Sequence, residues 1–405
     1  MDSPLASSHF EFLLRTRVRF GSGEGRNLAR YLQELPLARV GLVVDAGVAD
    51  QPYVREIVGA VKDAYGDRLI TWVYDLGAEP DYGSLDRIRT RFLDRSGKSS
   101  VDGFVGMGGG SVIDFAKGLA TLAVNPGEAI RYRGFPQGIV PSLPTVAVPT
   151  TAGTGSEVTY NAVFIDWGSS RKLGINTVHN FPALTILDPD LVATCPRRVL
   201  LSTGADALVH TLESYAARGA NPLTRVFARE AFFHVHTALT ELADRPESRE
   251  AVAHLQMGAY LAGISLMNAG SGPAGALSYP LGVRFRVPHG IAGGVFLPYL
   301  VAHNVEKGYD YRELHDRVVP GAGEKDSAAV NRAFAALIHD LCRKIGIPED
   351  LGAFGVTREN AGPLLADIDS LAAAFAQNPV SFTVEDGKAM VQRLIGGERA
   401  RVQES

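Results

Sequence analysis

A run of three glycines, Gly108-Gly109-Gly110, is the feature that most constrains how this chain can fold. Residues 101–107 before it form an apolar segment of strand length, and residues 112–124 after it carry apolar side chains at helical spacing. The glycines therefore lie at a strand-to-helix turn. Backbone N–H groups at the start of a helix lack partners within the helix, and a turn without Cβ atoms lets a pyrophosphate approach them closely. The run predicts a site for a phosphate-bearing cofactor.

A purely structural interpretation of the same turn is equally compatible with the sequence. Ser111 would cap the helix, and Asp114, three residues later, would complete a capping box. The spacing also departs from the usual dinucleotide fingerprint, because Ser111 stands where that pattern has its last small residue. The glycine run alone leaves both interpretations open.

The first half of the chain alternates between strand and helix patterns. Strands are predicted at residues 12–20, 40–45, 70–74, 101–107, 145–149 and 184–187, a hairpin at 162–166 and 172–175, and helices at 52–65, 84–93 and 112–124. This alternation predicts an α/β fold with a doubly wound parallel sheet. After Cys195-Pro196 only helical patterns follow, so we expect an α/β dinucleotide-binding domain at 1–196 and an all-helical domain at 197–405.

The loop after the strand at 145–149 is rich in hydrogen-bonding groups. Residues 150–157 hold four hydroxyl side chains and two glycines in eight residues. Because α/β sheets bind ligands at the carboxyl ends of their strands, the loop favours a ligand site. The alternative is a Ser/Thr turn in which Thr154 and Glu157 form a capping box.

Asp45 is the last residue of the strand predicted at 40–45 and so also lies at the carboxyl end of a strand. An acidic side chain at this place accepts hydrogen bonds from an adenosine ribose and repels a 2′-phosphate, which favours NAD over NADP. A plain turn residue before Gly47 is the alternative.

A candidate metal site lies in the helical half. Asp206 and His210 are four residues apart and therefore share one face of a helix, for which Ser202-Thr203 is the predicted cap. A carboxylate and an imidazole at this spacing are of metal-ligand type. Asp206 as the capping-box partner of Thr203, with a structural histidine, is the alternative. A further histidine, His289, stands at a tight turn between Pro288 and Gly290.

Composition excludes several classes of protein. A net charge of −4 with scattered arginines gives no attraction to nucleic acid, and no apolar stretch is long enough for a membrane span. Residues 1–10 have neither a basic start nor an apolar signal core, so we expect a cytoplasmic protein. Cys195 and Cys342 lack neighbouring Cys or His residues at metal-site spacing and are expected to be free thiols.

Taken together, these motifs resemble the iron-containing (group III) alcohol dehydrogenases in order and spacing. The resemblance rests on Gly108-Gly109-Gly110-Ser111 with Asp114 and Lys117, the segment from Pro149 to Thr159, Asp206 with His210, Pro280-Leu281-Gly282 and Pro288-His289-Gly290. It implies a nucleotide-binding α/β domain, an all-helical domain, and a cleft between them for NAD(P) and a divalent metal. It also implies reduction of a small aldehyde or ketone, or the reverse, by a homodimer or larger homo-oligomer.

The resemblance assigns site residues in this sequence. Cofactor-binding residues would be Asp45, Gly108, Gly109, Gly110, Ser111, Asp114, Thr150, Thr151, Thr154, Ser156 and Lys172. Metal ligands would be Asp206, His210 and His289. Gly275 falls where the family has a third histidine, and Tyr279 where another histidine is common. We therefore expect either a three-ligand iron or zinc site or no metal, with Tyr279, His210 or His289 as the acid in the second case.

Two other functions are compatible with the same motifs. One is a lyase or polyol-phosphate dehydrogenase of similar fold, and the other is a nucleotide-binding protein that has lost catalysis. The hydroxyl-rich loop argues against the first, and the three retained ligands argue against the second. The substrate is not identified, although arginines that can bind an anionic group suggest a small anionic aldehyde; they are Arg131, Arg133, Arg284 and Arg286.

Overall fold

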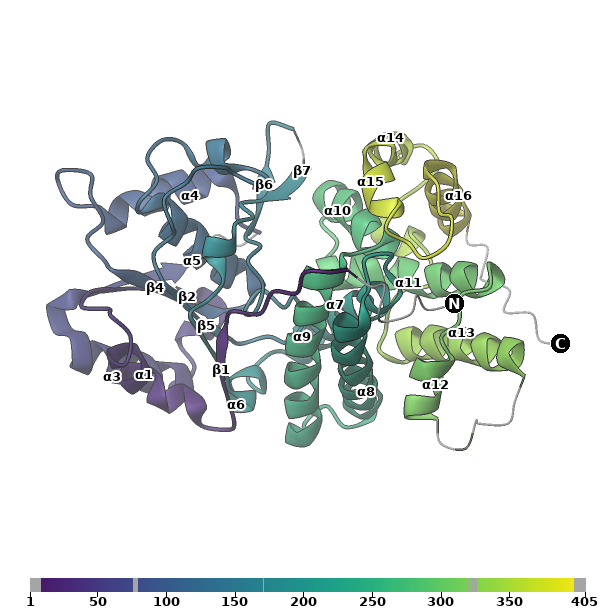
Figure 1. The fold of residues 1–405 in the computed structure, drawn as a ribbon, viewed down its shortest axis with the longest axis horizontal. Helices are drawn as coiled ribbons and strands as arrows, with labels where there is room; N and C mark the ends of the chain where they lie inside the picture. The colour runs from purple at the N-terminus through teal and green to yellow at the C-terminus, as the bar shows by residue number, and fades with distance from the viewer. Residues whose placement is uncertain (1–8, 76–78, 170, 320, 322–325, 397–405) are drawn as a thin grey trace. The chain divides into compact units, whose positions relative to one another are not determined.

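The computed structural model describes residues 9–75, 79–169, 171–319, 321 and 326–396. It divides into two compact units: one is Leu14–Pro196, and the other begins at Arg197 and also includes the described residues up to Leu13. Both are shown in Figure 1. Ser170, in the predicted hairpin turn, lies outside the described residues.

The first unit is built on a six-stranded sheet in the order β1-β8-β5-β4-β2-β3, in which every pair of neighbours is parallel. Its strands are β1 (Arg17–Phe20), β2 (Val40–Asp45), β3 (Leu69–Tyr74), β4 (Gly103–Gly108), β5 (Thr145–Pro149) and β8 (Leu184–Leu187). The predicted doubly wound parallel sheet is confirmed. The predicted strand at 12–20 is reduced to its last four residues, the length that pairs with β8.

Helices cover both faces of this sheet. They are α1 (Leu28–Gln33), α2 (Ala46–Ala49), α3 (Pro52–Tyr65), α4 (Tyr82–Arg89), α5 (Gly110–Leu122) and α6 (Pro189–Val192). Successive side chains of β2 alternate between two cores: Leu42 and Val44 pack with α1 and α3, whereas Val43 packs with α4 and α5. Figure 1 shows the two helix layers on opposite sides of the sheet. A separate antiparallel hairpin, β6 (Val163–Asp166) and β7 (Arg171–Gly174), agrees with the predicted one.

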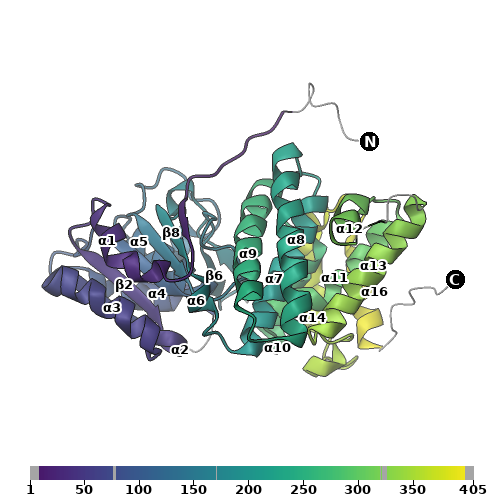
Figure 2. The same ribbon diagram turned by 90° about the horizontal axis from the view of Figure 1, so that it is seen from below.

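The second unit is helical throughout its described residues. Its α-helices are α7 (Arg197–Ala216), α8 (Pro222–Asp244), α9 (Arg249–Ala269), α10 (Pro273–Phe285), α11 (His289–Glu306), α12 (Arg312–Val318), α13 (Ser327–Lys344), α14 (Gly362–Asp367), α15 (Ala372–Phe375) and α16 (Val384–Ile395). Helix α7 packs against α8, α9 and α11, and α10 packs against α11. The long helices α7, α8 and α9 run side by side in Figure 2. In the part of the chain that the structure describes, no helix has the length and apolar character needed to cross a membrane.

Three local predictions in this unit are wrong. Helix α7 begins at Arg197, so Ser202 and Thr203 lie inside it and do not cap it, which also removes the capping-box role suggested for Asp206. The proline at position 280 predicts a turn at Tyr279, but Tyr279 lies within α10, because that helix accommodates Pro280. The amphipathic pattern at 361–376 predicts a single helix, but the structure breaks it into α14, a 3₁₀ turn and α15.

Candidate functional site: a phosphate-binding turn and a three-ligand metal centre

The carboxyl ends of three neighbouring strands bring the predicted cofactor residues of the first unit together. Strands β2, β4 and β5 are adjacent, with Gly108 of β4 paired to Pro149 of β5. The N–H of Thr150 donates to the carbonyl of Gly108 at 2.9 Å, which extends this pairing into the hydroxyl-rich loop. Asp45 is the last residue of β2, beside β4. One edge of the sheet therefore carries the acidic residue, the glycine turn and the threonines.

The glycine turn forms the N-terminus of α5 without a side-chain cap. Gly109 is the N-cap residue, and no side chain accepts a hydrogen bond there. The capping box suggested for Ser111 and Asp114 is therefore wrong. Asp114 instead accepts hydrogen bonds from Ser156 Oγ at 2.5 Å and from the N–H of Val163 at 2.9 Å. The start of α5 keeps the backbone donors that a phosphate group requires.

The hydroxyl-rich loop packs directly on this turn. A Cβ atom at Gly110 would lie 2.5 Å from Thr154 Oγ1, so only glycine allows this approach. The structure has no helix in the loop, and the suggested capping box of Thr154 with Glu157 is therefore wrong. Thr151 and Thr154 are partly exposed, whereas Thr150 and Ser156 are buried. A ligand at the glycine turn can therefore reach the hydroxyls of Thr151 and Thr154.

Lys117 on α5 holds the hydroxyl-rich loop in place, a role that the sequence did not reveal. Its fully buried ammonium group donates to the carbonyls of Ser156, Thr159 and Asn161 at 2.5, 2.9 and 2.8 Å, and to Ser156 Oγ at 3.0 Å. Burial lowers the pKa of Lys117 to about 8, and the negative charge of nearby Asp114 opposes that shift. The amine, Asp114 and Ser156 form one buried network that holds the loop against α5.

We predict that Lys117→Met lowers the free energy of unfolding by about 3 kcal/mol, because several buried acceptors lose their donor. Urea denaturation followed by circular dichroism measures this change. Lys62→Met, which removes an exposed lysine of α3, serves as the control and should unfold like the wild type. Equal stability of the two variants would contradict the anchoring role.

Two further residues predicted to bind the cofactor already have partners within the first unit. Asp45 Oδ1 accepts a hydrogen bond from the N–H of Gly47 at 2.8 Å and caps α2, which agrees with the turn role considered from sequence. Lys172 on β7 forms an ion pair with Glu79 at 2.7 Å. The hydrogen bond from Gly47 uses only Oδ1 of Asp45, the carboxylate oxygen nearer to α2.

In the second unit, the predicted metal ligands converge. Asp206 and His210 lie one turn apart on α7, and His289 is the first residue of α11, which packs against α7. One ligand atom from each of the three side chains lies within 4.8 Å of the other two. Asp206 and His210 are buried, and His289 is partly exposed.

The distances within this cluster suit a bound cation. Asp206 Oδ1 lies 3.5 Å from His210 Nε2 and 3.7 Å from His289 Nε2. Direct hydrogen bonds would bring these atoms to about 2.9 Å. Ligands about 2.0–2.1 Å from one tetrahedral ion lie roughly 3.3 Å apart, which is close to the observed spacing. The three residues present therefore fit a divalent metal such as zinc or iron.

Helix α10 supplies the neighbours of His289. The ring of Tyr279 lies against the His289 ring, with centroids 5.0 Å apart. Gly275, one turn earlier on α10, has no side chain, and a Cβ atom there would lie 2.8 Å from Glu213 Oε2 and 2.9 Å from Ser271 Oγ. The space beside Gly275 is thus bounded by a carboxylate.

Glu213 is a central residue of this region that the sequence-based prediction missed. Its buried carboxylate accepts hydrogen bonds from the N–H groups of Gly272, Ala274 and Gly275 at 2.9, 2.7 and 3.1 Å, and from Ser271 Oγ at 3.1 Å. Burial raises the pKa of Glu213, and these hydrogen bonds oppose the shift. The side chain therefore caps the N-terminus of α10 from α7. Its place seven residues after Asp206, and so on a similar face of the same helix, was the available signal.

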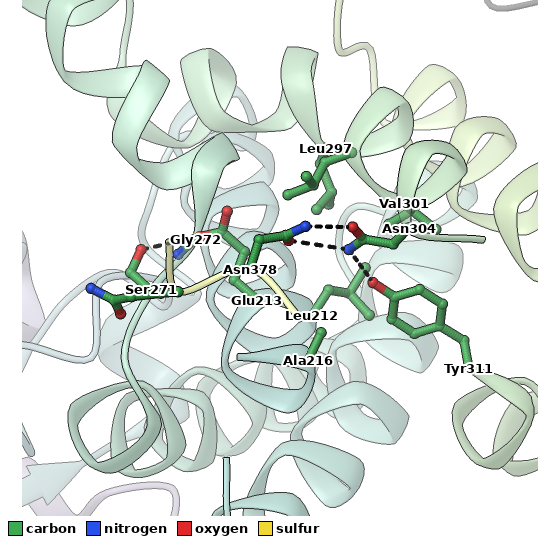
Figure 3. A pocket seen from close by; sticks show the side chains of 12 residues that line it. Leu212, Glu213, Ala216, Ser271, Gly272, Leu297, Val301, Asn304, Tyr311 and Asn378 are labelled. Atoms are coloured by element: carbon green, nitrogen blue, oxygen red, sulfur yellow. Dashed lines mark hydrogen bonds between the residues drawn. The ribbon is translucent and has the colours of Figure 1, made fainter. Parts of the chain in front are cut away.

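A small cavity lies beside Glu213, lined by both polar and apolar side chains (Figure 3). Asn304 donates to Tyr311 Oη at 2.9 Å and to Asn378 Oδ1 at 3.3 Å, and Asn378 donates back to Asn304 Oδ1 at 2.7 Å. These bonds join α11 to the segments before α12 and before α16. Residues of this group and of the Glu213 network, including Ser271 and Gly272, both line the cavity.

The sequence of this chain is similar to those of known proteins. Residues 15–189 match the model for the iron-containing alcohol dehydrogenases, and residues 200–395 match the model for the C-terminal part of the Fe-containing alcohol dehydrogenase family. The chain is 31% identical over 382 residues to the NAD-dependent methanol dehydrogenase of Bacillus methanolicus, covering 93% of this chain and 97% of the relative. It is 32% identical over 371 residues to the 1,3-propanediol dehydrogenase of Klebsiella pneumoniae, covering 89% and 92%.

The fold of this chain is also similar to that of a solved structure. The crystal structure of sulfoacetaldehyde reductase from Bifidobacterium kashiwanohense in complex with NAD+ superposes with a TM-score of 0.83 at 26% identity, covering 97% of this chain and all of that one. The expected class of activity, an NAD-linked oxidoreductase of alcohols and carbonyl compounds, is confirmed by these comparisons. Since two family models together span nearly the whole sequence, the chain belongs to the iron-containing alcohol dehydrogenase family.

Proposed function

We propose that this protein reduces a small aldehyde with NADH, or catalyses the reverse reaction, using a divalent metal held by Asp206, His210 and His289. The observation that carries the proposal is the convergence of these ligand atoms within 4.8 Å of one another. A bound divalent cation supplies the positive charge that stabilises the alkoxide formed when hydride reaches the carbonyl carbon. Three protein ligands leave a coordination position open, as catalytic zinc sites require.

The side chains around the metal ligands have separate tasks in this proposal. The Asp206 carboxylate offsets the charge of the cation, and the two imidazoles bind as neutral ligands. The Tyr279 ring lies against His289 and carries a phenolic O–H, which is a hydrogen-bond donor and proton source. We assign to Tyr279 the delivery of a proton to the alkoxide oxygen.

Replacing Tyr279 by phenylalanine tests that assignment. The ring contact with His289 is kept and only the hydroxyl is lost, so we expect kcat to fall about a hundredfold while the metal content stays the same. Steady-state kinetics and elemental analysis of the same preparations measure both quantities. A Tyr279→Phe enzyme with wild-type kcat would leave the tyrosine only a packing role.

Cofactor binding in this proposal rests on the first unit. The uncapped start of α5 at Gly109 and Gly110 holds the pyrophosphate, together with the reachable hydroxyls of Thr151 and Thr154. Asp45, at the adjacent end of β2, accepts hydrogen bonds from the adenosine ribose. Asp114, Thr150 and Ser156 support the loop and do not touch the nucleotide in this proposal.

We predict that Asp45→Ala reduces the preference for NADH over NADPH by about tenfold or more, because the carboxylate no longer repels a 2′-phosphate. Comparing kcat/KM for the two cofactors measures the change. The control is Asp50→Ala, which removes an exposed carboxylate just after α2 and should leave the preference unaltered. A wild-type enzyme that uses NADPH as well as NADH would contradict the role of Asp45.

The substrate we favour is a small aldehyde with an anionic group. The similarity to a sulfoacetaldehyde reductase supports this choice. Two of the arginines suggested from sequence are already paired, Arg133 with Asp166 and Arg284 with Asp367. Arg286 is exposed, follows α10 and has a φ of 54°, a left-handed conformation that is costly for a residue with a side chain. Arg286 is therefore our candidate for binding the anionic group.

The direct test of the proposed activity is NADH oxidation with a panel of neutral and anionic aldehydes after loading with zinc or iron. We expect turnover with short-chain aldehydes, a higher kcat/KM for anionic ones, and loss of turnover on chelation. No turnover with any aldehyde under any metal condition would support the alternative of a nucleotide-binding protein without catalysis. A homodimeric or larger assembly and a cytoplasmic location remain predictions from the sequence.

A further inference from the structure

Helices α8 and α9 carry a pair of histidines that the proposed activity does not use. His234 of α8 and His254 of α9 lie with their Nδ1 atoms 2.8 Å apart. Their ring centroids are 4.8 Å apart, so the two Nδ1 atoms lie between the rings and face each other. The two helices run side by side (Figure 2), and both imidazoles are partly exposed. The pair is therefore not sealed inside the core.

The short distance keeps at least one of the two rings neutral. Two ring nitrogens at 2.8 Å need one N–H and one lone pair between them, whereas two protonated rings would repel each other. Burial, and then the charge of a protonated His254, lower the pKa of His234. Neutral imidazole is the form that binds transition metals. A cation that displaces the proton between the rings therefore finds two nitrogen ligands.

The spacing of the two nitrogens matches neighbouring corners of a square. Nitrogens about 2.0–2.1 Å from one ion are about 2.9 Å apart when the angle at the ion is 90°, and roughly 3.3 Å apart in a tetrahedron. The observed 2.8 Å is close to the first value, whereas the ligand atoms of the three-ligand centre lie 3.5 and 3.7 Å apart. Square or tetragonal coordination by imidazole is typical of Cu²⁺ and Ni²⁺, and tetrahedral coordination of Zn²⁺.

The charged groups around the pair leave a net negative charge. Glu250, one turn before His254 on α9, has its Oε1 3.6 Å from His254 Nε2. This distance is too long for a hydrogen bond, but a carboxylate on that side favours a ring proton at Nε2 and a lone pair at Nδ1. On the side of His234, the charges of Glu230 and Arg317 offset each other, because the two form an ion pair at 2.8 Å.

We propose that His234 and His254 form a second metal site, selective for Cu²⁺ or Ni²⁺, that joins α8 to α9. The ion is bound through the two Nδ1 atoms, and water fills its remaining positions. This site is separate from the centre formed by residues of α7 and α11. A bound ion stabilises the contact between the two helices, because only the folded chain holds the two imidazoles together.

Binding of Ni²⁺ to tag-free protein that already holds one equivalent of Zn²⁺ tests the proposal. Equilibrium dialysis followed by elemental analysis of both metals should show one Ni²⁺ per chain in addition to the Zn²⁺. In His254→Gln and His234→Gln, the Ni²⁺ affinity should fall about tenfold or more, because one imidazole remains. Comparison with these variants isolates the pair whichever metal occupies the three-ligand centre.

Thermal unfolding gives a second measurement of the same site. At a Ni²⁺ concentration ten times its Kd, the melting temperature of the wild type should rise by about 4 °C. The rise should be absent in His254→Gln and in His234→Gln. Circular dichroism without Ni²⁺ should show that both variants are folded.

His339→Gln is the matched control. The side chains of His339 and His254 are both 24% exposed, but His339 Nδ1 faces a carboxylate, Asp340 Oδ1, at 3.8 Å. This variant should bind Ni²⁺ like the wild type. Total metal that stays at one equivalent, an unchanged Ni²⁺ affinity in His254→Gln, or an equal loss of affinity in His339→Gln would each overturn the proposal.

Discussion

Replacing Asp206 by alanine is expected to lower kcat/KM for aldehyde reduction by about a thousandfold or more. The variant loses the only carboxylate of the ligand cluster among the described residues, and a cation that stabilises an alkoxide contributes several kcal/mol to the barrier. Elemental analysis should show that metal is lost together with turnover. His210→Ala and His289→Ala should behave in the same way, because three ligands leave no redundancy.

The chain offers a matched control for this experiment. Asp316 lies beside His315 on α12, with 3.1 Å between Oδ1 and Nδ1, and so forms a second carboxylate–imidazole pair outside the ligand cluster. Asp316→Ala should retain metal and turnover. An Asp206→Ala enzyme that keeps both would mean that the cluster is not the catalytic centre.

Replacing Glu213 by alanine is expected to lower the free energy of unfolding by about 4 kcal/mol. The four donors at the start of α10 lose their buried acceptor, and each unsatisfied buried donor costs about 1–3 kcal/mol before relaxation or water entry. For a unit of this size the melting temperature should fall by about 10 °C. Calorimetry on metal-free protein measures the effect without a contribution from metal binding.

Two other variants define what Glu213 contributes. Glu213→Gln keeps the shape and one acceptor oxygen but turns an amide toward N–H donors, so its stability should lie between those of Glu213→Ala and the wild type. Glu306→Ala, at the exposed end of α11, should unfold like the wild type. If Glu213→Ala is as stable as Glu306→Ala, Glu213 does not fix the start of α10.

Much of the fold could be predicted because its signals are local. The apolar run at 145–149 and the helical periodicity at 52–65 give elements with the predicted bounds. Alternation of strands and helices then indicates a parallel sheet, since parallel strands need a crossover. The same local logic failed at Ser111, where a capping box was equally plausible but a distant loop bonds to Asp114 instead.

The ligand cluster could be predicted only in part. The spacing of Asp206 and His210 places both on one face of α7 whatever the tertiary structure, whereas His289 was linked to them only by resemblance. Glu213 acts through contacts with the start of α10 that no spacing in the sequence encodes. Lys117 was visible as part of a motif, but its acceptors lie about forty residues along the chain, as in its bond to the Ser156 carbonyl.

The central claim is that turnover depends on one divalent cation held by Asp206, His210 and His289. Its most direct test is to titrate metal-free protein with Zn²⁺ or Fe²⁺ under anaerobic conditions and to measure bound metal and the rate of NADH oxidation at each step. We predict saturation at one equivalent per chain, with the rate rising in proportion to occupancy and lost again on chelation. Full turnover in protein with no bound metal would contradict the account.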